Sequence, residues 1–360
     1  MRVLALVPGL YDISPSQRYR IEQWEPLLRE RGVEITYEPF ESPELNLLLY
    51  QPGKMAKKLA LVAEGFGRRF SVVKKAKDFD LVYILREAAL LGPPVFERMV
   101  RKTGVPIVFD FDDAIFVSYR SPSNGYLSYL KFASKTRTTC RLASHVMVGN
   151  PYLAEYARQV NDHVTVIPTT IDTERYRVPP PKSQNGPLVI GWTGSHSTVQ
   201  HLDTLRGALK KLASRDQFRL RVIGTPVYDC PPIDVEAMRW RAATEVDDLA
   251  PIDIGVMPLP EDKWSKGKCG AKALQFMGMG IPTVCSPVGV NSEIIQDDQN
   301  GFLASTEDEW VDKLSRLLRS PELRRRLGQA GRVTVEQKYS ALSQAPRVYE
   351  VFKSVLRERG

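Results

Sequence analysis

The chain has 360 residues, a formal net charge of +8 and an apolar content of 43%. That length suggests about two globular domains, each able to bury a core. The basic excess either serves solubility or indicates an anionic partner, which could be a nucleotide phosphate, a nucleic acid or an acidic lipid. The four cysteines and four histidines show no metal-ligand spacing, which argues against a zinc site and suits reduced thiols in a cytoplasmic protein. No run of apolar residues is long enough to predict a membrane span.

Strand-like and helix-like segments alternate along the N-terminal half of the sequence. Residues 19–31 have helical spacing of apolar side chains and end at a glycine. Buried strands are predicted at residues 3–7, 33–37, 81–85, 107–111, 145–148 and 164–167. Alternation of this kind predicts a parallel sheet covered by helices. We therefore expect a Rossmann-like first domain over residues 1–180.

A stretch rich in proline and polar residues, 179–187, interrupts this pattern and is typical of a linker. The alternation then restarts and predicts a second domain over residues 187–340. Its expected strands are 188–191, 220–223, 252–257 and 283–286, and its expected helices include 199–212, 307–318 and 321–337. A last helix, 342–360, is expected to pack back on the first domain. The fold class is therefore α/β, with two doubly wound domains and a ligand outside the C-terminal ends of their strands, in the cleft between them.

The segment 266–280 carries the strongest functional signal. Lys268 and Lys272 are four residues apart and Gln275 follows three residues later, so the three share one face of a helix. Two ammonium groups beside a helix N-terminus form a site for a diphosphate. The segment also holds four glycines, Gly270 among them, which weaken a helix unless a ligand approaches the backbone closely. The alternative interpretation is a solvated basic helix face.

Further candidates for the same ligand lie at other strand ends of the second domain. The stretch 191–197 (GWTGSHS) follows the first strand and opens a helix, so small residues such as Gly194 and Ser195 can admit a phosphate. The alternative is an ordinary turn in which Ser197 or Thr198 caps the helix. We also expect Gly224 and Thr225 to border the base, Trp264 to line the pocket or serve as core or lid, and Glu293 to bind hydroxyl groups or favour its helix dipole.

These stretches together resemble family 4 glycosyltransferases, the group 1 enzymes of the GT-B fold. The similarity covers residues 188–340 and extends loosely to residues 16–20 of the first domain. It rests on residues 253–259, 268–282, 289–293 and 297–303. The resemblance implies transfer of a sugar from a nucleotide-diphosphate sugar, bound on the C-terminal domain, to an acceptor on the N-terminal domain. It also implies retention of configuration and no required metal or other cofactor. Lys268 and Lys272 would then stabilise the departing diphosphate.

The sequence departs from this family at its donor motif, which carries two glutamates eight positions apart. Gly267 and Gln275 stand at those positions. Gln275 can still hydrogen-bond ribose hydroxyls, but it offers no carboxylate. This loss leaves room for a non-catalytic nucleotide- or glycan-binding protein of the same fold. A sugar-nucleotide epimerase is a further alternative, although few acid or base groups lie on the donor side.

Three carboxylates, Asp110, Asp112 and Asp113, close a strand of the first domain within the run FDFDD. We expect Asp110 or Asp112 to orient the acceptor hydroxyl or to take its proton. Alternation places these two on one side of an extended chain and Asp113, a candidate acceptor ligand, on the other. The alternatives are helix capping and the metal-binding D-x-D of the other glycosyltransferase fold, which the restart of the pattern after the linker disfavours.

Two more candidates follow the first strand of the chain. The resemblance implies that the loop containing Gly9 approaches the donor phosphates. Arg18 and Arg20 suit an anionic acceptor or the diphosphate, because a guanidinium binds phosphate oxygens in pairs. The alternative for both arginines is the start of a surface helix.

Two segments of the first domain, 54–77 and 126–141, interleave basic with apolar residues. A basic amphipathic segment can lie on an anionic membrane surface, and a lipid-linked acceptor would explain both segments. The alternative is a solvated basic helix. Nucleic acid is disfavoured, because no recognised binding motif accompanies the charge. We therefore expect a cytoplasmic protein at the inner face of the membrane.

Overall fold

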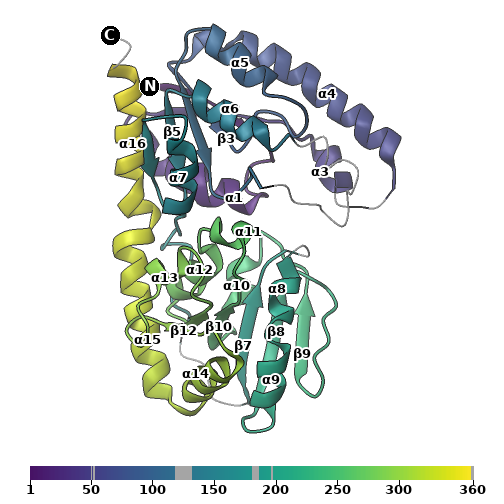
Figure 1. Ribbon diagram of the computed structural model, residues 1–360, viewed down its shortest axis with the longest axis vertical. Helices are drawn as coiled ribbons and strands as arrows, with labels where there is room; N and C mark the ends of the chain where they lie inside the picture. The colour runs from purple at the N-terminus through teal and green to yellow at the C-terminus, as the bar shows by residue number, and fades with distance from the viewer. Residues whose placement is uncertain (50, 52, 118–131, 181–185, 196–197, 358–360) are drawn as a thin grey trace. The chain divides into compact units, whose positions relative to one another are not determined.

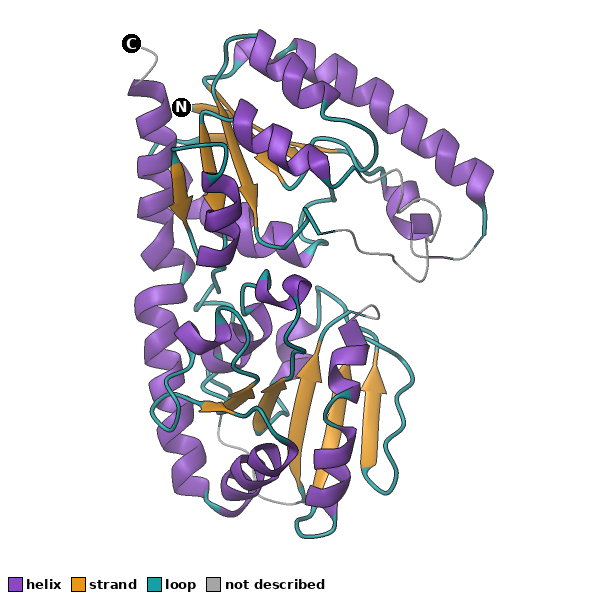
Figure 2. Cartoon of the chain, viewed as in Figure 1, coloured by secondary structure: helices purple, strands orange, loops and turns teal. Residues whose placement is uncertain are grey.

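The computed structural model describes residues 1–49, 51, 53–117, 132–180, 186–195 and 198–357. The chain forms two compact units (Figures 1 and 2). Unit 1 consists of Met1–Thr169 together with Gln344–Gly360, and unit 2 consists of Thr170–Ser343. Each unit is an α/β layer structure with one six-stranded sheet in its described residues, as the alternation in the sequence predicts.

The sheet of unit 1 is parallel throughout and has the order β2-β1-β3-β4-β5-β6. Its strands are β1 (Arg2–Val7), β2 (Glu34–Pro39), β3 (Leu81–Leu85), β4 (Ile107–Phe111), β5 (His145–Val148) and β6 (Val164–Val166). Every residue of β3 and β4 is buried, because helices cover parallel sheets on both faces and leave continuous apolar runs inside. From β1 the chain adds β2 on one side of the sheet, and it then adds β3 to β6 on the other side. The strand order therefore reverses between β1 and β3, and ligand-binding loops are expected at the C-terminal ends of these two strands.

Helices connect the strands of unit 1. They are α1 (Pro15–Gln17), a π-helix (Arg18–Glu22), α2 (Gln23–Arg29), α3 (Pro43–Leu49), α4 (Met55–Lys74), a short 3-10 helix (Ala76–Asp78), α5 (Val95–Lys102), α6 (Ser134–Leu142), α7 (Pro151–Arg158) and the larger part of α16 (Ala341–Arg357). The α16 helix packs on this unit through an edge contact between Phe352 and Tyr83 and through Arg347, which donates to the Val166 carbonyl at 2.9 Å.

The sheet of unit 2 is also parallel and has the order β12-β11-β10-β7-β8-β9. Its strands are β7 (Leu188–Thr193), β8 (Phe218–Ile223), β9 (Asp234–Met238), β10 (Ile254–Met257), β11 (Thr283–Cys285) and β12 (Phe302–Leu303). The strand order reverses between β7 and β10. The C-terminal ends of these two strands therefore mark the switch point at which α/β sheets bind ligands.

Helices flank this second sheet (Figure 2). They are α8 (Val199–Asp203), α9 (Arg206–Ala213), α10 (Glu245–Leu249), α11 (Lys263–Lys266), α12 (Ala271–Gly278), α13 (Asn291–Ile294), α14 (Glu307–Arg319), α15 (Pro321–Thr334) and a π-helix (Val335–Tyr339). The α14 helix begins with a capping box formed by Thr306 and Glu309, which satisfies N–H groups that a helix start would leave without partners.

The division between the units lies before the proline-rich stretch that the sequence suggests as a linker. Residues just after Thr170 belong to unit 2, because Arg332 donates to the carbonyls of Thr173 and Tyr176. Residues 181–185 of the suggested linker lie outside the described part of the chain. None of the helices in that described part combines the length and apolar character needed to span a bilayer.

Candidate functional site

Two glycine loops meet at the C-terminal edge of the unit 2 sheet. Gly194 follows β7, and Gly224 follows the neighbouring strand β8. The Gly194 N–H donates to the Ile223 carbonyl at 2.8 Å. A Cβ atom on Gly224 would lie 2.2 Å from the Gly194 oxygen, and Gly224 has a φ of 134°, which side chains disfavour. The loops therefore pack backbone against backbone at the switch-point end of the sheet.

The segment from α11 into α12 forms the second part of the site. Asp262 caps α11 by accepting from the Ser265 N–H at 2.7 Å, and the Lys268 N–H donates to the Ser265 carbonyl at 3.0 Å. Gly270 precedes α12 with a φ of 70°, where a side chain would collide with α13. Lys272 stands in the first turn of α12, which contains no acidic residue. Its charge therefore adds to the positive end of the helix dipole.

Both lysines lie over indole rings, and one of these contacts joins the two parts of the site. The Lys272 Nζ lies 4.7 Å from the Trp192 ring centroid, and the Lys268 Nζ lies 4.8 Å from that of Trp264. A Cβ atom on Gly194 would lie 2.4 Å from Trp192. Trp192 therefore touches the Gly194 loop and the Lys272 ammonium, so the stretches 191–195 and 268–272 meet in space.

His201, on α8, reports the electrostatic character of this cluster. Burial together with the charges of Lys272 and Lys268 lowers the pKa of His201 to about 4, although Asp262 acts in the opposite direction. The imidazole is therefore neutral at pH 7. The charges of both lysines therefore act on this position, where an anion would meet them.

Gln275 is buried and is part of a network around Glu245. Its Nε2 donates to Glu245 Oε1 at 2.8 Å, and the Trp240 indole N–H donates to the same oxygen at 2.8 Å. The Tyr176 hydroxyl donates to Glu245 Oε2 at 2.6 Å. A carboxylate at position 275 would face the Glu245 carboxylate. The amide at this position instead donates to its buried neighbour.

The other donor-side candidates differ in accessibility. The Ser195 N–H donates to Thr198 Oγ1 at 3.0 Å, so Thr198 closes this turn, whereas Ser197 lies outside the described residues. Thr225 is buried, and its hydroxyl donates to the Val227 carbonyl at 3.0 Å. Glu293, in the short helix α13, is exposed.

In unit 1, Arg20 and Asp110 form a fully buried ion pair. The Arg20 Nε and Nη2 donate to the two Asp110 oxygens at 2.9 and 2.6 Å, and the Tyr83 hydroxyl donates to the same carboxylate. Neither charged side chain is exposed. This geometry argues against the expected contacts of Asp110 and Arg20 with an acceptor, because each group already satisfies the other inside the fold.

Asp112 and Asp113 both face Arg86, which the sequence analysis did not select. Arg86 Nε lies 2.8 Å from Asp112, and its Nη2 lies 3.5 Å from Asp113. The expectation that Asp113 points away from Asp112 is therefore wrong, because β4 ends at Phe111 and alternation no longer applies. Burial alone would raise the pKa of Asp112, but Arg86 and other donors hold it below its ordinary value. The described residues contain no group of three potential metal-binding acids, histidines or cysteines.

The loop after β1 is held by a second set of buried groups. The Gly9 N–H donates to Gln17 Oε1 at 3.3 Å, and the Asp12 N–H donates to Glu22 Oε2 at 2.9 Å. Arg18 is buried and pairs with Asp12 at 2.9 Å, so it is not the exposed helix start of the alternative interpretation. Burial raises the pKa of Glu22 to about 7.

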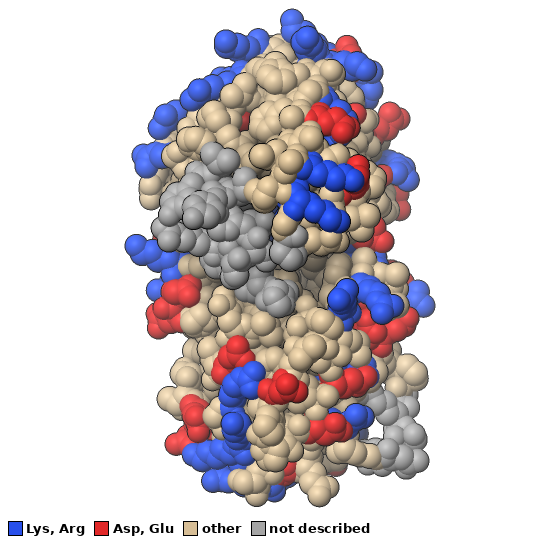
Figure 3. Space-filling view, turned by 90° about the vertical axis from the view of Figure 1, so that its right-hand side faces the viewer, with Lys and Arg blue, Asp and Glu red and all other residues tan. Residues whose placement is uncertain are grey.

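The surface of α4 carries apolar side chains among basic ones. Met55, Leu59 and Phe70 are 45%, 50% and 42% exposed. Two of the basic residues expected on this surface turn inward: Lys58 donates to the Gln51 carbonyl, and Arg69 donates to the Glu38 carbonyl. Lys and Arg side chains still stand out over the upper part of the face in Figure 3. Residues 118–131, part of the second basic segment, lie outside the described residues.

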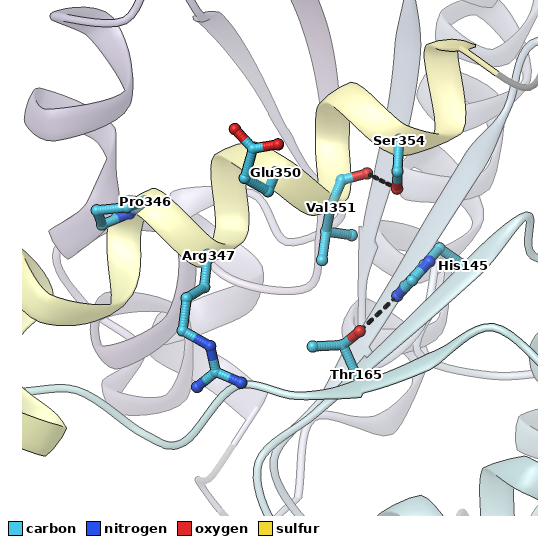
Figure 4. Close-up of a pocket in the computed structure, with 7 residues that line it drawn as sticks. All are labelled: His145, Thr165, Pro346, Arg347, Glu350, Val351 and Ser354. Carbon is cyan, nitrogen blue, oxygen red and sulfur yellow. Dashed lines mark hydrogen bonds between the residues drawn. The ribbon is translucent and has the colours of Figure 1, made fainter.

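Unit 1 also has a hollow of about 440 Å³ beside α16. Figure 4 shows the residues that line it, including Arg347, Glu350 and the pair His145–Thr165, whose side chains lie 2.9 Å apart. None of the site residues selected from the sequence lines this hollow. It is therefore separate from the clusters described above.

Four residues of these clusters escaped the sequence analysis: Trp192, His201, Glu245 and Arg86. Trp192 lies within the stretch 191–197, but an apolar residue near the end of a buried strand is expected to be part of the core. Glu245 lies 30 residues before Gln275, and no spacing rule joins positions so far apart. Arg86 has a φ of 57°, which no sequence pattern indicates for an arginine.

Comparison with known proteins finds one family match and several structures of similar fold. Residues 187–320 match the family described as "Glycosyl transferases group 1". Sucrose-phosphate synthase from Thermosynechococcus elongatus is 15% identical with a TM-score of 0.70, covering 99% of this chain and 100% of that one. A glycosyltransferase from Rickettsia africae is 14% identical with a TM-score of 0.68, covering 99% and 98%. HepE from Anabaena, in complex with UDP-glucose, is 16% identical with a TM-score of 0.67, covering 98% and 100%.

These likenesses show the fold, and the sequence match adds the family of residues 187–320. The GT-B fold and the resemblance stated from the sequence are thereby confirmed. A search among curated proteins finds no match to the chain.

Proposed function

Because the chain carries a group 1 glycosyltransferase domain on a GT-B fold, we propose that it moves a sugar from a nucleotide-diphosphate sugar to a glycan or lipid-linked acceptor. The observation that carries this proposal is the cluster of Lys268 and Lys272 at the strand ends where Gly194 and Gly224 meet. It combines positive charge, helix N–H groups and close backbone access, which together suit a diphosphate.

In the proposed reaction, the two lysines and the first turn of α12 stabilise the negative charge that develops on the departing diphosphate. Such stabilisation acts on the transition state more than on the bound substrate, so it increases the rate. The donor-side residues of the proposal are Gly194, Ser195, Gly224, Thr225, Trp264, Gly270, Gln275 and Glu293. We propose retention of configuration and no metal requirement on the strength of the family resemblance.

A uridine nucleotide is the first donor to test, because the solved structure of HepE is a complex with UDP-glucose. On the acceptor side we propose Gly9, Asp112, Asp113 and Arg18. Asp112 is the strongest of these, because its partly accessible carboxylate is kept ionised by Arg86 and can accept a hydrogen bond from an acceptor hydroxyl.

The exposed apolar side chains of α4 support a location at an anionic membrane surface. Met55, Leu59 and Phe70 can enter the interface while neighbouring lysines meet acidic headgroups. Flotation with phosphatidylglycerol vesicles tests this: Leu59→Asp should lower the bound fraction. Leu342→Asp, which alters an exposed leucine in unit 2, is the matched control and should not. Equal binding of the two variants would refute the membrane location.

The experiment that tests the main proposal is a thermal-shift panel of nucleoside diphosphates and nucleotide sugars. A ligand that binds only the folded state stabilises it by about 2.7 kcal/mol at one hundred times its Kd. One base should stabilise the wild type, and Lys272→Ala should weaken that ligand about tenfold or more, because a hydrogen bond to a charged group contributes ~1.5–3 kcal/mol.

The matched control is Lys210→Ala, which removes an exposed lysine of α9 in the same unit and should keep the shift. No shift with any nucleotide would overturn the proposal. Transfer or hydrolysis of the stabilising donor then distinguishes an enzyme from a binding protein.

A further inference from the structure

The two lysines of the proposed diphosphate site share an unusual support, a tryptophan ring beneath each ammonium. The Nζ–centroid distances are 4.7 Å for Lys272 over Trp192 and 4.8 Å for Lys268 over Trp264. These distances are within the range of cation–π attraction, and tryptophan is the strongest of the aromatic partners. Trp192 belongs to β7 and Trp264 to α11. Two different elements therefore each place a tryptophan ring beneath a lysine of the site.

Trp192 has properties that simple core packing does not explain. The residue is fully buried in the core of unit 2, and its indole N–H has no hydrogen-bond partner among the described residues. Burying an N–H without an acceptor is unfavourable, and phenylalanine or leucine would fill a core without that cost. Packing alone therefore does not explain a tryptophan at this position, whereas the contact of its ring with the Lys272 ammonium does.

The same indole also fixes the loop that approaches the ligand. A Cβ atom on Gly194 would lie 2.4 Å from the Trp192 ring and 2.7 Å from Thr198 Oγ1. The loop backbone is thus seated directly on the ring. Trp192 thereby sets the position of two site components, the Gly194 backbone and the Lys272 ammonium, that lie far apart in the sequence.

We propose that Trp192 is a positioning residue of the diphosphate site, whose indole holds the Lys272 ammonium beside the Gly194 loop. Trp264 holds Lys268 in the same way. An aromatic face attracts the cation through its quadrupole and carries no formal charge. This inference rests on the proposed function.

Inorganic pyrophosphate is the probe, because it reports the diphosphate site independently of the nucleotide base. Isothermal titration calorimetry should show that Trp192→Leu weakens pyrophosphate binding about tenfold, the equivalent of ~1.4 kcal/mol. Trp192→Phe should show a smaller loss, because its ring attracts a cation more weakly. Trp264→Leu should weaken binding as well, with little effect on folding, since Trp264 is only partly buried.

Trp310 supplies the matched control. It is another buried tryptophan of the same core, and no cation–π contact with a lysine is recorded for it among the described residues. Trp310→Leu should lower the melting temperature but leave pyrophosphate affinity unchanged. A second control is the Lys272→Met background, in which Trp192→Phe should cause a smaller loss than in the wild type, because only the contact with the Gly194 loop remains to be lost.

The outcomes separate this inference from the proposed function. If Lys272→Ala binds pyrophosphate like the wild type, the diphosphate site itself is wrong. If Lys272→Ala weakens binding while Trp192→Phe and Trp264→Leu do not, only the positioning role is overturned. An equal loss from Trp192→Phe with and without Lys272 would assign the effect to packing and would also overturn it. If Trp192→Leu fails to fold, the Trp192→Phe comparison in the two backgrounds decides.

Discussion

Lys272 of unit 2 and Arg20 of unit 1 are both cations near the C-terminal edge of a parallel sheet, but they are held by opposite means. Arg20 is buried against the Asp110 carboxylate at 2.9 and 2.6 Å, whereas Lys272 lies over the Trp192 ring. An ion pair cancels its own field and an aromatic face does not. Burial lowers the pKa of His201, and the charges of Lys272 and Lys268 lower it further.

This contrast separates two uses of charge within one chain. In unit 1 the arginine and carboxylate serve the interior of the fold, and in unit 2 the lysines lie over aromatic rings at the proposed diphosphate site. It also predicts which substitutions should unfold the protein and which should only weaken ligand binding.

The largest effect is expected from Arg20→Ala, which leaves the buried Asp110 carboxylate without its cation. Breaking a buried pair on one side costs about 3–5 kcal/mol, and urea unfolding measures that loss directly. The double variant Arg20→Met with Asp110→Asn should recover much of it, because no uncompensated charge is then buried. A loss for Arg20→Ala below about 1 kcal/mol would mean that the pair behaves like a surface salt bridge, and the contrast would fail.

Gln275→Glu should produce the next largest effect, because it sets a second carboxylate beside buried Glu245. The Gln275 Nε2 now lies 2.8 Å from a Glu245 oxygen. Replacing this donor with a like charge should lower the free energy of unfolding by about 1–3 kcal/mol at neutral pH. The loss should shrink in mild acid, where one of the paired carboxyls can take up a proton and donate again.

Gln275→Met is the control for this prediction. It removes the amide without adding charge, so it should cost about 1 kcal/mol and show no such acid recovery. If Gln275→Glu were as stable as the wild type at neutral pH, the donor motif glutamate would be tolerated here. The buried network would then not explain its absence.

The fold was readable from the sequence because alternation is a local property. The expected strands 81–85 and 107–111 coincide with β3 and β4, since each is a short apolar run between turn residues. The lysine cluster was also readable, because helical spacing and a high glycine content lie within one short segment. These signals need no knowledge of which distant residues will meet.

The partners of the charged groups were not readable for the opposite reason. Asp110 ends a strand, where a carboxylate can face either an acceptor or an arginine, and its arginine lies 90 residues earlier. Trp192 looks like any core tryptophan until Lys272, from a distant helix, is seen above its ring. Sequence reasoning therefore located the charges but could not say which of them the fold had already neutralised.

Lys272→Ala should show the reverse profile of Arg20→Ala. It should change the free energy of unfolding by less than about 1 kcal/mol, because an accessible cation–π contact contributes ~0.5–1 kcal/mol. It should nonetheless remove most of the stabilisation by the bound nucleoside diphosphate. Urea unfolding with and without the nucleotide measures both quantities in one series. A large loss of stability without ligand would show that Lys272 is structural, like Arg20.

The smallest effect is a pH dependence that arises from His201. Burial, Lys272 and Lys268 lower its pKa from 6.5 to about 4, against the opposing charge of Asp262. The unfolded chain therefore takes up this proton at a higher pH than the folded protein. The stability contribution is fully present above pH 6.5 and is lost as the pH falls toward 4. His201→Gln, which does not titrate, should lose less stability than the wild type across this interval.

Ligand binding should reverse the sign of the local field and so change this titration. The negative charges of pyrophosphate offset those of Lys268 and Lys272, which raises the pKa of His201 in the complex above its value of about 4 in the free protein. Binding should then be accompanied by proton uptake, and affinity should increase as the pH falls below 6.5. Calorimetry in two buffers with different heats of ionisation measures this uptake. If His201→Gln takes up as many protons as the wild type, the lysines do not control this imidazole, and their field is weaker than the contrast with Arg20 requires.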